Sequence, residues 1–231
     1  MGNKIKKIFI GSNQVRPPTW KPWSNTLAYR PINETTTTTD QSWNNYGLSR
    51  SWTITYDSIS ASTDGSSYFT QTNGRIYELA SVSQLTVSLR YRFTTAWSWD
   101  VKTIYFMGSM SNAWRKFHLY REVWGKLVLN GGYYTPEEYS SISANTRYNI
   151  TLTWDGTTTT MYLNWSSVSA GTHSYEKNYW NTIYLFRTSS SSSPLPDVSW
   201  SKLSNVIIEN RAWDSAEVSK YYNLTKWIYW L

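Results

Sequence analysis

The sequence predicts an all-β sandwich of two antiparallel sheets, followed by one short C-terminal helix. The first observation is residues 149–167, where two alternating segments flank Asp155-Gly156, because glycine supplies the positive φ that a hairpin turn needs. The second is residues 85–93, where apolar residues alternate with Thr86, Ser88 and two arginines, as in a strand at the core of one sheet. At 231 residues, one large all-β domain fits the chain.

The first arm of the hairpin is predicted to be half buried, because successive strand side chains point to opposite faces. We expect the apolar side to face the core: Tyr148, Ile150, Leu152 and Trp154. We expect the polar side to face water: Asn149, Thr151 and Thr153. The returning strand is predicted over Met161–Leu163.

Apolar and β-branched runs predict further strands at Thr26–Tyr29, Leu85–Phe93, Thr103–Met107, Lys116–Arg121, Lys126–Leu129, Thr182–Phe186 and Leu203–Glu209. The low-complexity runs Thr35–Thr39 and Ser189–Ser193 are predicted to be loops. Near the C-terminus, Asp214 or Ser215 can cap a short helix with Glu217 in its first turn. Its stripe of Val218, Tyr221 and Tyr222 is expected to pack on the sandwich.

Five segments recur in the order of a known superfamily. Residues 149–167, NITLTWDGTTTTMYLNWSS, are similar to "hhVALTYDGTTVKLYVNG", and the others are residues 27–48, 62–70, 85–93 and 202–224. Together they resemble the concanavalin A-like lectin/glucanase superfamily, in particular its laminin G-like (LamG) members. This resemblance implies a concanavalin A-like jelly roll that binds rather than reacts.

Tryptophan stands at two positions where the resembled motifs have glycine, Trp43 in the loop after the opening strand and Trp165 at the end of the hairpin. One explanation is a reassigned stop codon that means glycine in the host and was written as tryptophan. The other is that both tryptophans are genuine and pack on the sheet. In either case the 15 tryptophans are poor evidence of sugar binding.

The chain divides into a basic N-terminal arm with a Pro-rich linker, residues 1–24, and the predicted sandwich, residues 25–231. Residues 1–30 carry six basic and no acidic side chains, whereas the rest is nearly neutral. Such an arm suits an acidic partner, a membrane surface or nucleic acid, or is a solvated strand end. The basic side chains placed for partner binding are Lys4, Lys6, Lys7 and Arg16.

Residues 4–18, KIKKIFIGSNQVRPP, resemble a leader of phage tail and surface proteins, usually "KKIYIGSTQVRP". This resemblance implies an external virion protein at the virion surface, or extracellular, that contacts other virion proteins through its arm. The start has too short an apolar core for a signal peptide, and lysis would release a virion protein without one. No apolar run is long enough to span a membrane. With no cysteine, disulfides and thiolate metal sites are excluded.

The pattern of acidic residues favours a chain that is not an enzyme. Glucanases of the superfamily place carboxylates on alternate residues of one strand. Here Glu137 and Glu138 are adjacent, while Glu209 and Asp214 straddle a strand-to-helix junction. No catalytic residue is therefore predicted.

The two histidines, His118 and His173, lie in no serine-hydrolase motif, and His118 is expected on the solvent face between two apolar neighbours. Asp40 matches a loop aspartate of the resembled family, which implies a possible structural Ca²⁺. The alternative is that Asp40 forms an Asx turn. No other cofactor is expected.

Carbohydrate binding would use aromatic rings for the C–H faces of a sugar and nearby polar side chains for its hydroxyls. Three groups of loop residues have this make-up: Trp97, Trp99 and Asp100; Asn112, Trp114 and Arg115; and Asn130, Tyr133 and Tyr134. The third is favoured, because two glycines precede its tyrosines. Each aromatic could instead pack in the core or within a loop.

Two functions remain from these observations. One is a carbohydrate-binding adhesion module on a phage tail or head, with a cell-surface glycan as partner. The other is a structural virion protein whose sandwich contacts only neighbouring subunits. Nucleic-acid binding is not expected, because only the arm is basic. The sequence leaves homo-oligomerisation open.

Overall fold

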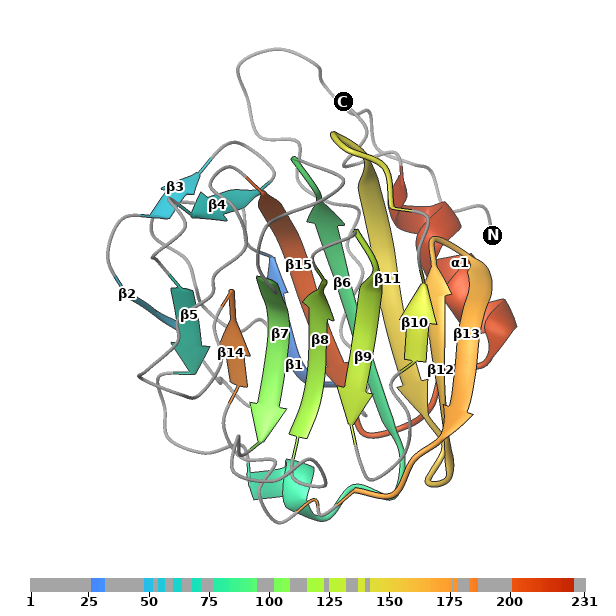
Figure 1. Cartoon of the computed structure of the whole chain (residues 1–231). Helices are drawn as coiled ribbons and strands as arrows, with labels where there is room; N and C mark the ends of the chain where they lie inside the picture. Colours follow the sequence, from blue (N-terminus) through green and yellow to red (C-terminus); the bar gives the residue numbers. More distant parts are fainter. Residues whose placement is uncertain are drawn as a thin grey trace, which may run out of the picture.

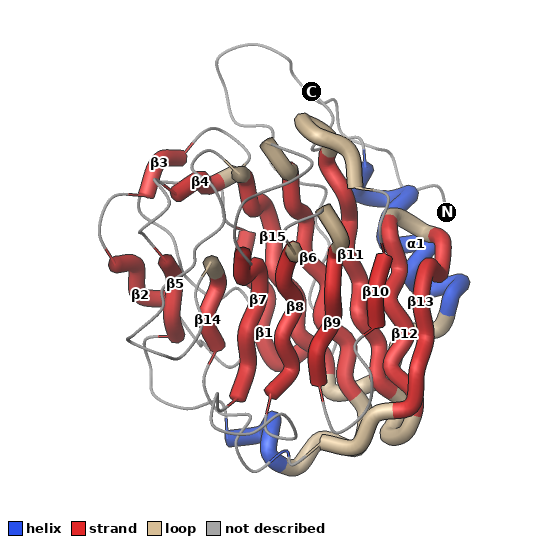
Figure 2. Tube along the Cα trace, in the orientation of Figure 1, coloured by secondary structure: helices blue, strands red, loops and turns tan. Residues whose placement is uncertain are grey.

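The computed structural model describes residues 26–31, 48–51, 54–56, 60–63, 68–71, 77–94, 102–108, 116–122, 125–131, 137–139, 142–175, 177, 183–186 and 201–226. Their strands form two antiparallel sheets that face each other, as the sequence predicts (Figure 1). Figure 2 shows that strands dominate and that α1, Ser215–Thr225, is the main helix. A short 3-10 turn, η1, covers Tyr77–Ala80.

The eight-stranded sheet has the order β13-β12-β11-β6-β15-β4-β3, with β1 also paired to β15. In that order the bounds are Ser166–Thr172, Thr158–Leu163, Arg147–Trp154, Leu85–Arg92, Lys202–Glu209, Ala61–Thr63 and Ile54–Tyr56, with β1 at Thr26–Pro31. The central position of β6, between β11 and β15, confirms the expectation for residues 85–93.

The seven-stranded sheet has the order β10-β9-β8-β7-β14-β5-β2. In that order the bounds are Glu137–Tyr139, Leu127–Gly131, Lys116–Arg121, Lys102–Gly108, Ile183–Leu185, Tyr68–Gln71 and Leu48–Ser51. The predicted strands all match observed ones, with ends that differ by up to three residues. The sequence predictions missed the short strands β2, β3, β4, β5 and β10 and the small-residue strand β13.

The main core fills the space between the sheets. On the β11 side it contains Ile150, Leu152 and Trp154, and Tyr148 packs against it, which confirms the predicted apolar face. The facing sheet contributes Phe117 and other alternate residues of β8 and β9. Full burial of such a side chain contributes about 1.5–3 kcal/mol, so this core supplies the main stabilisation in a chain without disulfides.

The polar face of β11 does not face water, contrary to the prediction. Asn149, Thr151 and Thr153 are each no more than 5% exposed. The reason lies in the C-terminal segment, because Trp213 and α1 pack on the outer face of this sheet and form a second core with residues of β12 and β15. Polar strand residues are accommodated there by hydrogen bonds, such as the 2.9 Å bond between the hydroxyls of Ser88 and Thr151.

Helix α1 begins as predicted. The Asp214 carboxylate accepts from the backbone N–H of Glu217 at 2.8 Å, and the Glu217 carboxylate accepts from the backbone N–H of Asp214 at 3.1 Å, a complete capping box. The expected stripe of Val218, Tyr221 and Tyr222 is buried against the sheet. One face of the sandwich is therefore closed by the chain itself.

The hairpin turn between β11 and β12 also matches its prediction. Gly156 has φ +106°, and a Cβ there would lie 3.0 Å from the Ser83 carbonyl oxygen, so glycine is required for both conformation and space. The carboxylate of Asp155 accepts from the backbone N–H groups of Thr158, at 2.7 Å, and Thr157, at 2.9 Å. These two bonds lower the pKa of Asp155 below its ordinary value of 3.8.

Replacing Asp155 by asparagine is expected to make unfolding less sensitive to acid. Because the folded pKa is depressed, the carboxylate stabilises the fold above pH 3.8 and loses this contribution as the pH falls through the lower, folded pKa. The difference in unfolding free energy between wild type and Asp155→Asn should therefore shrink below about pH 4. Urea titrations at pH 7, 4 and 3 measure it, and a constant difference would contradict the assignment.

Candidate functional site

The outer face of the seven-stranded sheet, which points away from the core, carries a row of polar and aromatic side chains. Strand pairing aligns the row across the sheet, from β2 through β5, β14, β7 and β8 to β9. We call the aligned residues the outer row: Ser49, Thr70, Tyr184, His118 and Asn130. Their neighbours in sequence, such as Phe69, Leu185 and Phe117, point into the core, so the residues of the outer row point outward. Phe106 occupies the β7 position of this register.

The ends of the outer row are accessible. Ser49 is exposed, while Thr70, Tyr184 and Asn130 are partly exposed. The middle is packed more closely, because His118 is only 6% exposed. Its Nε2 shares a 2.9 Å hydrogen bond with the Thr103 hydroxyl, and its ring lies 4.7 Å from that of Tyr120, centroid to centroid. His118 is thus on the predicted face, but the prediction that it meets solvent is wrong, since these neighbours on β7 and β8 cover it.

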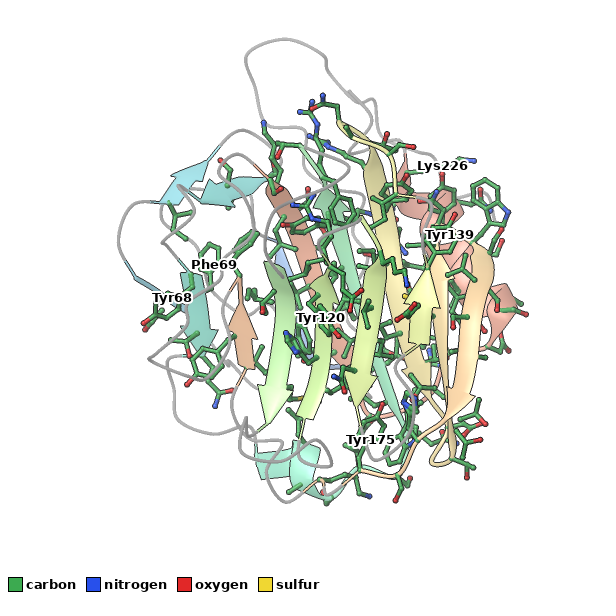
Figure 3. The ribbon with its side chains drawn as sticks, in the orientation of Figure 1. Tyr68, Phe69, Tyr120, Tyr139, Tyr175 and Lys226 are labelled. Atoms are coloured by element: carbon green, nitrogen blue, oxygen red, sulfur yellow. The ribbon has the colours of Figure 1, made fainter. Side chains whose placement is uncertain are left out.

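Tyr120 lies beside this row in the middle of the sheet (Figure 3). Burial raises the pKa of its phenol, the Glu122 carboxylate raises it further, the hydrogen bond with Asn130 opposes the shift, and Glu138 adds a smaller increase. The phenol is therefore a neutral hydrogen-bonding group at physiological pH. Together with the imidazole of His118 and the amide of Asn130, it provides hydrogen-bonding groups next to aromatic rings.

Of the four acidic residues that the sequence singled out, Glu138, Glu209 and Asp214 have structural partners. The side chain of Glu137 is outside the part of the chain that the structure describes. Glu138 is exposed and pairs with the Lys126 ammonium at 2.7 Å, which raises the pKa of Lys126. Glu209 is fully buried and accepts from the Trp213 indole N–H at 2.6 Å. Asp214 caps α1, as described above. The second histidine, His173, is buried, with its Nδ1 2.9 Å from the Tyr175 hydroxyl.

The described residues contain no group of three or more His, Cys, Asp or Glu side chains that could hold a metal ion. The possible calcium ligand Asp40 lies outside them. Nor does any described helix have the length and apolar character needed to cross a membrane.

Of the sequence-predicted binding residues, the structure describes only Asn130, which it places in the outer row next to His118. The others lie outside the described residues: Tyr133, Tyr134, Trp97, Trp99, Asp100, Asn112, Trp114, Arg115, and the arm residues Lys4, Lys6, Lys7 and Arg16. Trp43, where glycine or a tryptophan packed on the sheet was predicted, also lies outside them. Sequence analysis missed Thr70, Tyr120 and Tyr184. The alternation of His118 and Tyr120 with core residues signals their face, but only the register across separate strands aligns the row.

No protein-family model and no curated protein matches this sequence. Solved structures match the fold at low identity. The botulinum neurotoxin serotype C1 binding domain has a TM-score of 0.67 and 14% identity over 86% of this chain and 52% of that one. The botulinum neurotoxin DC binding domain, in complex with SialylT, has a TM-score of 0.68 and 13% identity over 87% and 51%.

A sialidase of Trypanosoma rangeli, in complex with sialic acid, has a TM-score of 0.70 and 12% identity over 87% of this chain and 33% of that one. This chain therefore spans about half of the toxin domains and a third of the sialidase. At such identities the matches show the shared fold alone, a β-sandwich of two antiparallel sheets.

Proposed function

We propose that this chain is a non-catalytic carbohydrate-binding module that holds a glycan across the outer face of its seven-stranded sheet. The observation that carries the proposal is the outer row, which aligns hydroxyl, phenol, imidazole and amide groups across neighbouring strands. Sugars present hydroxyls that need such partners and C–H faces that pack on aromatic rings. On the opposite face of the sandwich, Trp213 and α1 pack over residues of β12 and β15, so this part of the face is not available in this way.

The dimensions suit an extended oligosaccharide. Neighbouring strands lie about 4.8 Å apart, so the row from β2 to β9 extends over about 24 Å. Tyr184 and Asn130, which are partly exposed, can contact a ligand, and His118 and Tyr120 form a rigid base between them. Side chains that are already ordered by packing lose little conformational entropy when a ligand binds.

The structural matches support this function by analogy, since two of those proteins are complexes with SialylT and with sialic acid. The leader-like residues 4–18 support a location on the surface of a phage virion, where the basic arm would attach the module to other virion proteins. A cell-surface glycan would then be the ligand in adhesion. Calcium bound through Asp40 would have a structural role only.

Replacing Asn130 and Tyr184 by alanine, singly and together, is expected to weaken glycan binding about tenfold per residue, because each removes a direct contact. Binding is measured on a glycan array and by affinity electrophoresis in soluble polysaccharides. The exposed Asn210, beyond β15 in the other sheet, provides the matched control Asn210→Ala.

The double variant Tyr133→Ala and Tyr134→Ala tests the neighbouring loop, with weaker binding and nearly unchanged thermal stability expected.

Unchanged binding in Asn130→Ala and Tyr184→Ala would remove the outer row from consideration. The alternative function, a structural virion protein without a glycan ligand, predicts no array signal for the wild type and stoichiometric incorporation into virions.

A further inference from the structure

An exposed tryptophan lies on the other side of the sandwich, at the turn between β12 and β13. Trp165 is 52% exposed, and its ring contacts that of Tyr222 on α1 with centroids 4.9 Å apart and an interplanar angle of 47°. The Lys226 ammonium lies 5.7 Å from the centroid of the same tyrosine ring. Figure 3 labels Lys226 beside α1, away from Tyr120 on the seven-stranded sheet. We call Trp165, Tyr222 and Lys226 the Trp165 platform.

Hydrogen bonds to Asn149 fix the turn that carries Trp165, and burial fixes Tyr222. Asn164, which has φ +61°, donates its backbone N–H to the Asn149 carbonyl at 2.7 Å, and its side-chain oxygen accepts from the Asn149 N–H at 3.1 Å. Tyr222 is 4% exposed and fixed on the helix. The indole therefore packs on the helix rather than on the sheet, and it presents its exposed surface without needing to be ordered by a ligand.

The surroundings of the indole are polar. Ser166 and Ser167 follow it and are exposed, and the exposed Asn223 accepts a hydrogen bond from the Lys226 ammonium at 2.8 Å. Leu224 is the other exposed large hydrophobic residue among those described. It is two positions from Tyr222 on the helix, about 200° around the axis, and so faces away from the platform.

This arrangement distinguishes among ligands. A protein partner or a lipid surface needs a contiguous apolar area, whereas among the described residues the indole is followed by two exposed serines, and the exposed Asn223 is next to Tyr222 in sequence. A sugar ring matches this pattern, with its C–H face on the indole and its hydroxyls on the serines and asparagines. The Lys226 ammonium, beside the tyrosine ring on which the indole packs, favours a sugar that carries a carboxylate.

We propose that the Trp165 platform is a second binding site, for a single carboxylate-bearing sugar unit such as a uronic or sialic acid. The site is independent of the outer row, because it lies on the helix side of the sandwich. A chain with both sites could hold an acidic glycan at one face and an extended saccharide at the other. The platform requires tryptophan at position 165.

The experiment uses the full chain and an array of uronic acid and sialic acid oligosaccharides, each printed beside its carboxyl-reduced neutral form. Wild type is expected to bind the acidic forms at least fivefold more tightly. Trp165→Ala should weaken binding of the acidic forms at least tenfold, and Trp165→Tyr should retain most of it. Lys226→Gln should remove the preference for the acidic form, and added salt should reduce that preference.

Two variants serve as matched controls. Leu224→Ala removes an equally exposed apolar side chain, and Lys220→Gln removes an exposed ammonium from the same helix. Neither should change binding, and melting temperatures should confirm that every variant is folded.

Three results would overturn the proposal: no binding of any acidic glycan, equal binding of acidic and neutral forms, or unchanged binding by Trp165→Ala. Peptide mass spectrometry of protein from the native source provides a fourth test. Glycine at position 165 there would mean that the native protein has no platform.

Discussion

Replacing Arg90 by alanine is expected to lower the free energy of unfolding by about 2–4 kcal/mol. Arg90 is 4% exposed on the outer face of β6, and its guanidinium donates to the carbonyl of Thr225 at 3.0 Å and to the hydroxyl of the same residue. It also lies 5.9 Å from the ring centroid of Tyr221. Its loss leaves polar groups at the C-terminal end of α1 buried without their donor, since helix carbonyls there have no partner within the helix.

Urea denaturation followed by circular dichroism measures this effect. The matched control is Arg92→Ala, two residues further along the same strand and on the same face, where the guanidinium donates a 3.3 Å bond to the side chain of exposed Asn145. A change within about 0.5 kcal/mol is expected there. Equal losses in the two variants would contradict the assigned role of Arg90 in holding α1.

Replacing Glu209 by alanine is expected to cost about 3 kcal/mol at the other end of the helix. The carboxylate is fully buried and accepts from the Trp213 indole at 2.6 Å and from the Arg211 Nε at 3.1 Å. Alanine would leave the buried indole N–H without this acceptor. Arg211 would keep its 2.6 Å ion pair with Glu217.

The variant Glu209→Gln keeps an acceptor for the indole and is expected to recover about half of the loss. Glu217→Gln, which alters a partly exposed member of the same network, should cost about 1 kcal/mol or less. Thermal denaturation of the three variants ranks these costs. A Glu209→Ala protein as stable as Glu217→Gln would show that the buried carboxylate does not anchor the C-terminal segment.

These two anchors have a consequence for function. Arg90 and Glu209 hold the ends of the C-terminal segment on the eight-stranded sheet, and this closes one outer face of the sandwich. An extended ligand is then left with the face of the seven-stranded sheet. The helix in turn supports Trp165 through Tyr222, so the same packing that closes one face also builds the platform at its edge.

The local features of the fold were predictable from sequence because they depend on neighbours along the chain. The period-two pattern located β6 and β11, Asp155-Gly156 located the hairpin turn between β11 and β12, and Asp214 with Glu217 located the start of α1. The short strands were missed for a related reason. Segments of three or four residues, such as β3 and β10, carry too little of the period-two pattern to be recognised.

The candidate site could be predicted only in part. Asn130 was identified from its loop aromatics, but the structure places it in a row with residues from distant segments, including Thr70 and Tyr184. A register across non-consecutive strands is a tertiary property, because it depends on which strands pair and how they are aligned. The exposure of His118 was misjudged for the same reason, since Thr103 covers it from a neighbouring strand.

By itself, the sequence determined that this protein is a sandwich of alternating strands with a capped C-terminal helix, since side-chain alternation, turn glycine and helix cap act over a few residues. Only the tertiary structure decided which polar faces of the strands are exposed to solvent. Asn149, Thr151 and Thr153 look like solvent-facing residues along the chain, and they are buried because α1, more than 60 residues later, packs over the face of the sheet that carries them. The physical reason is that a strand specifies two faces by alternation, while the element that covers each face is set by packing between distant segments.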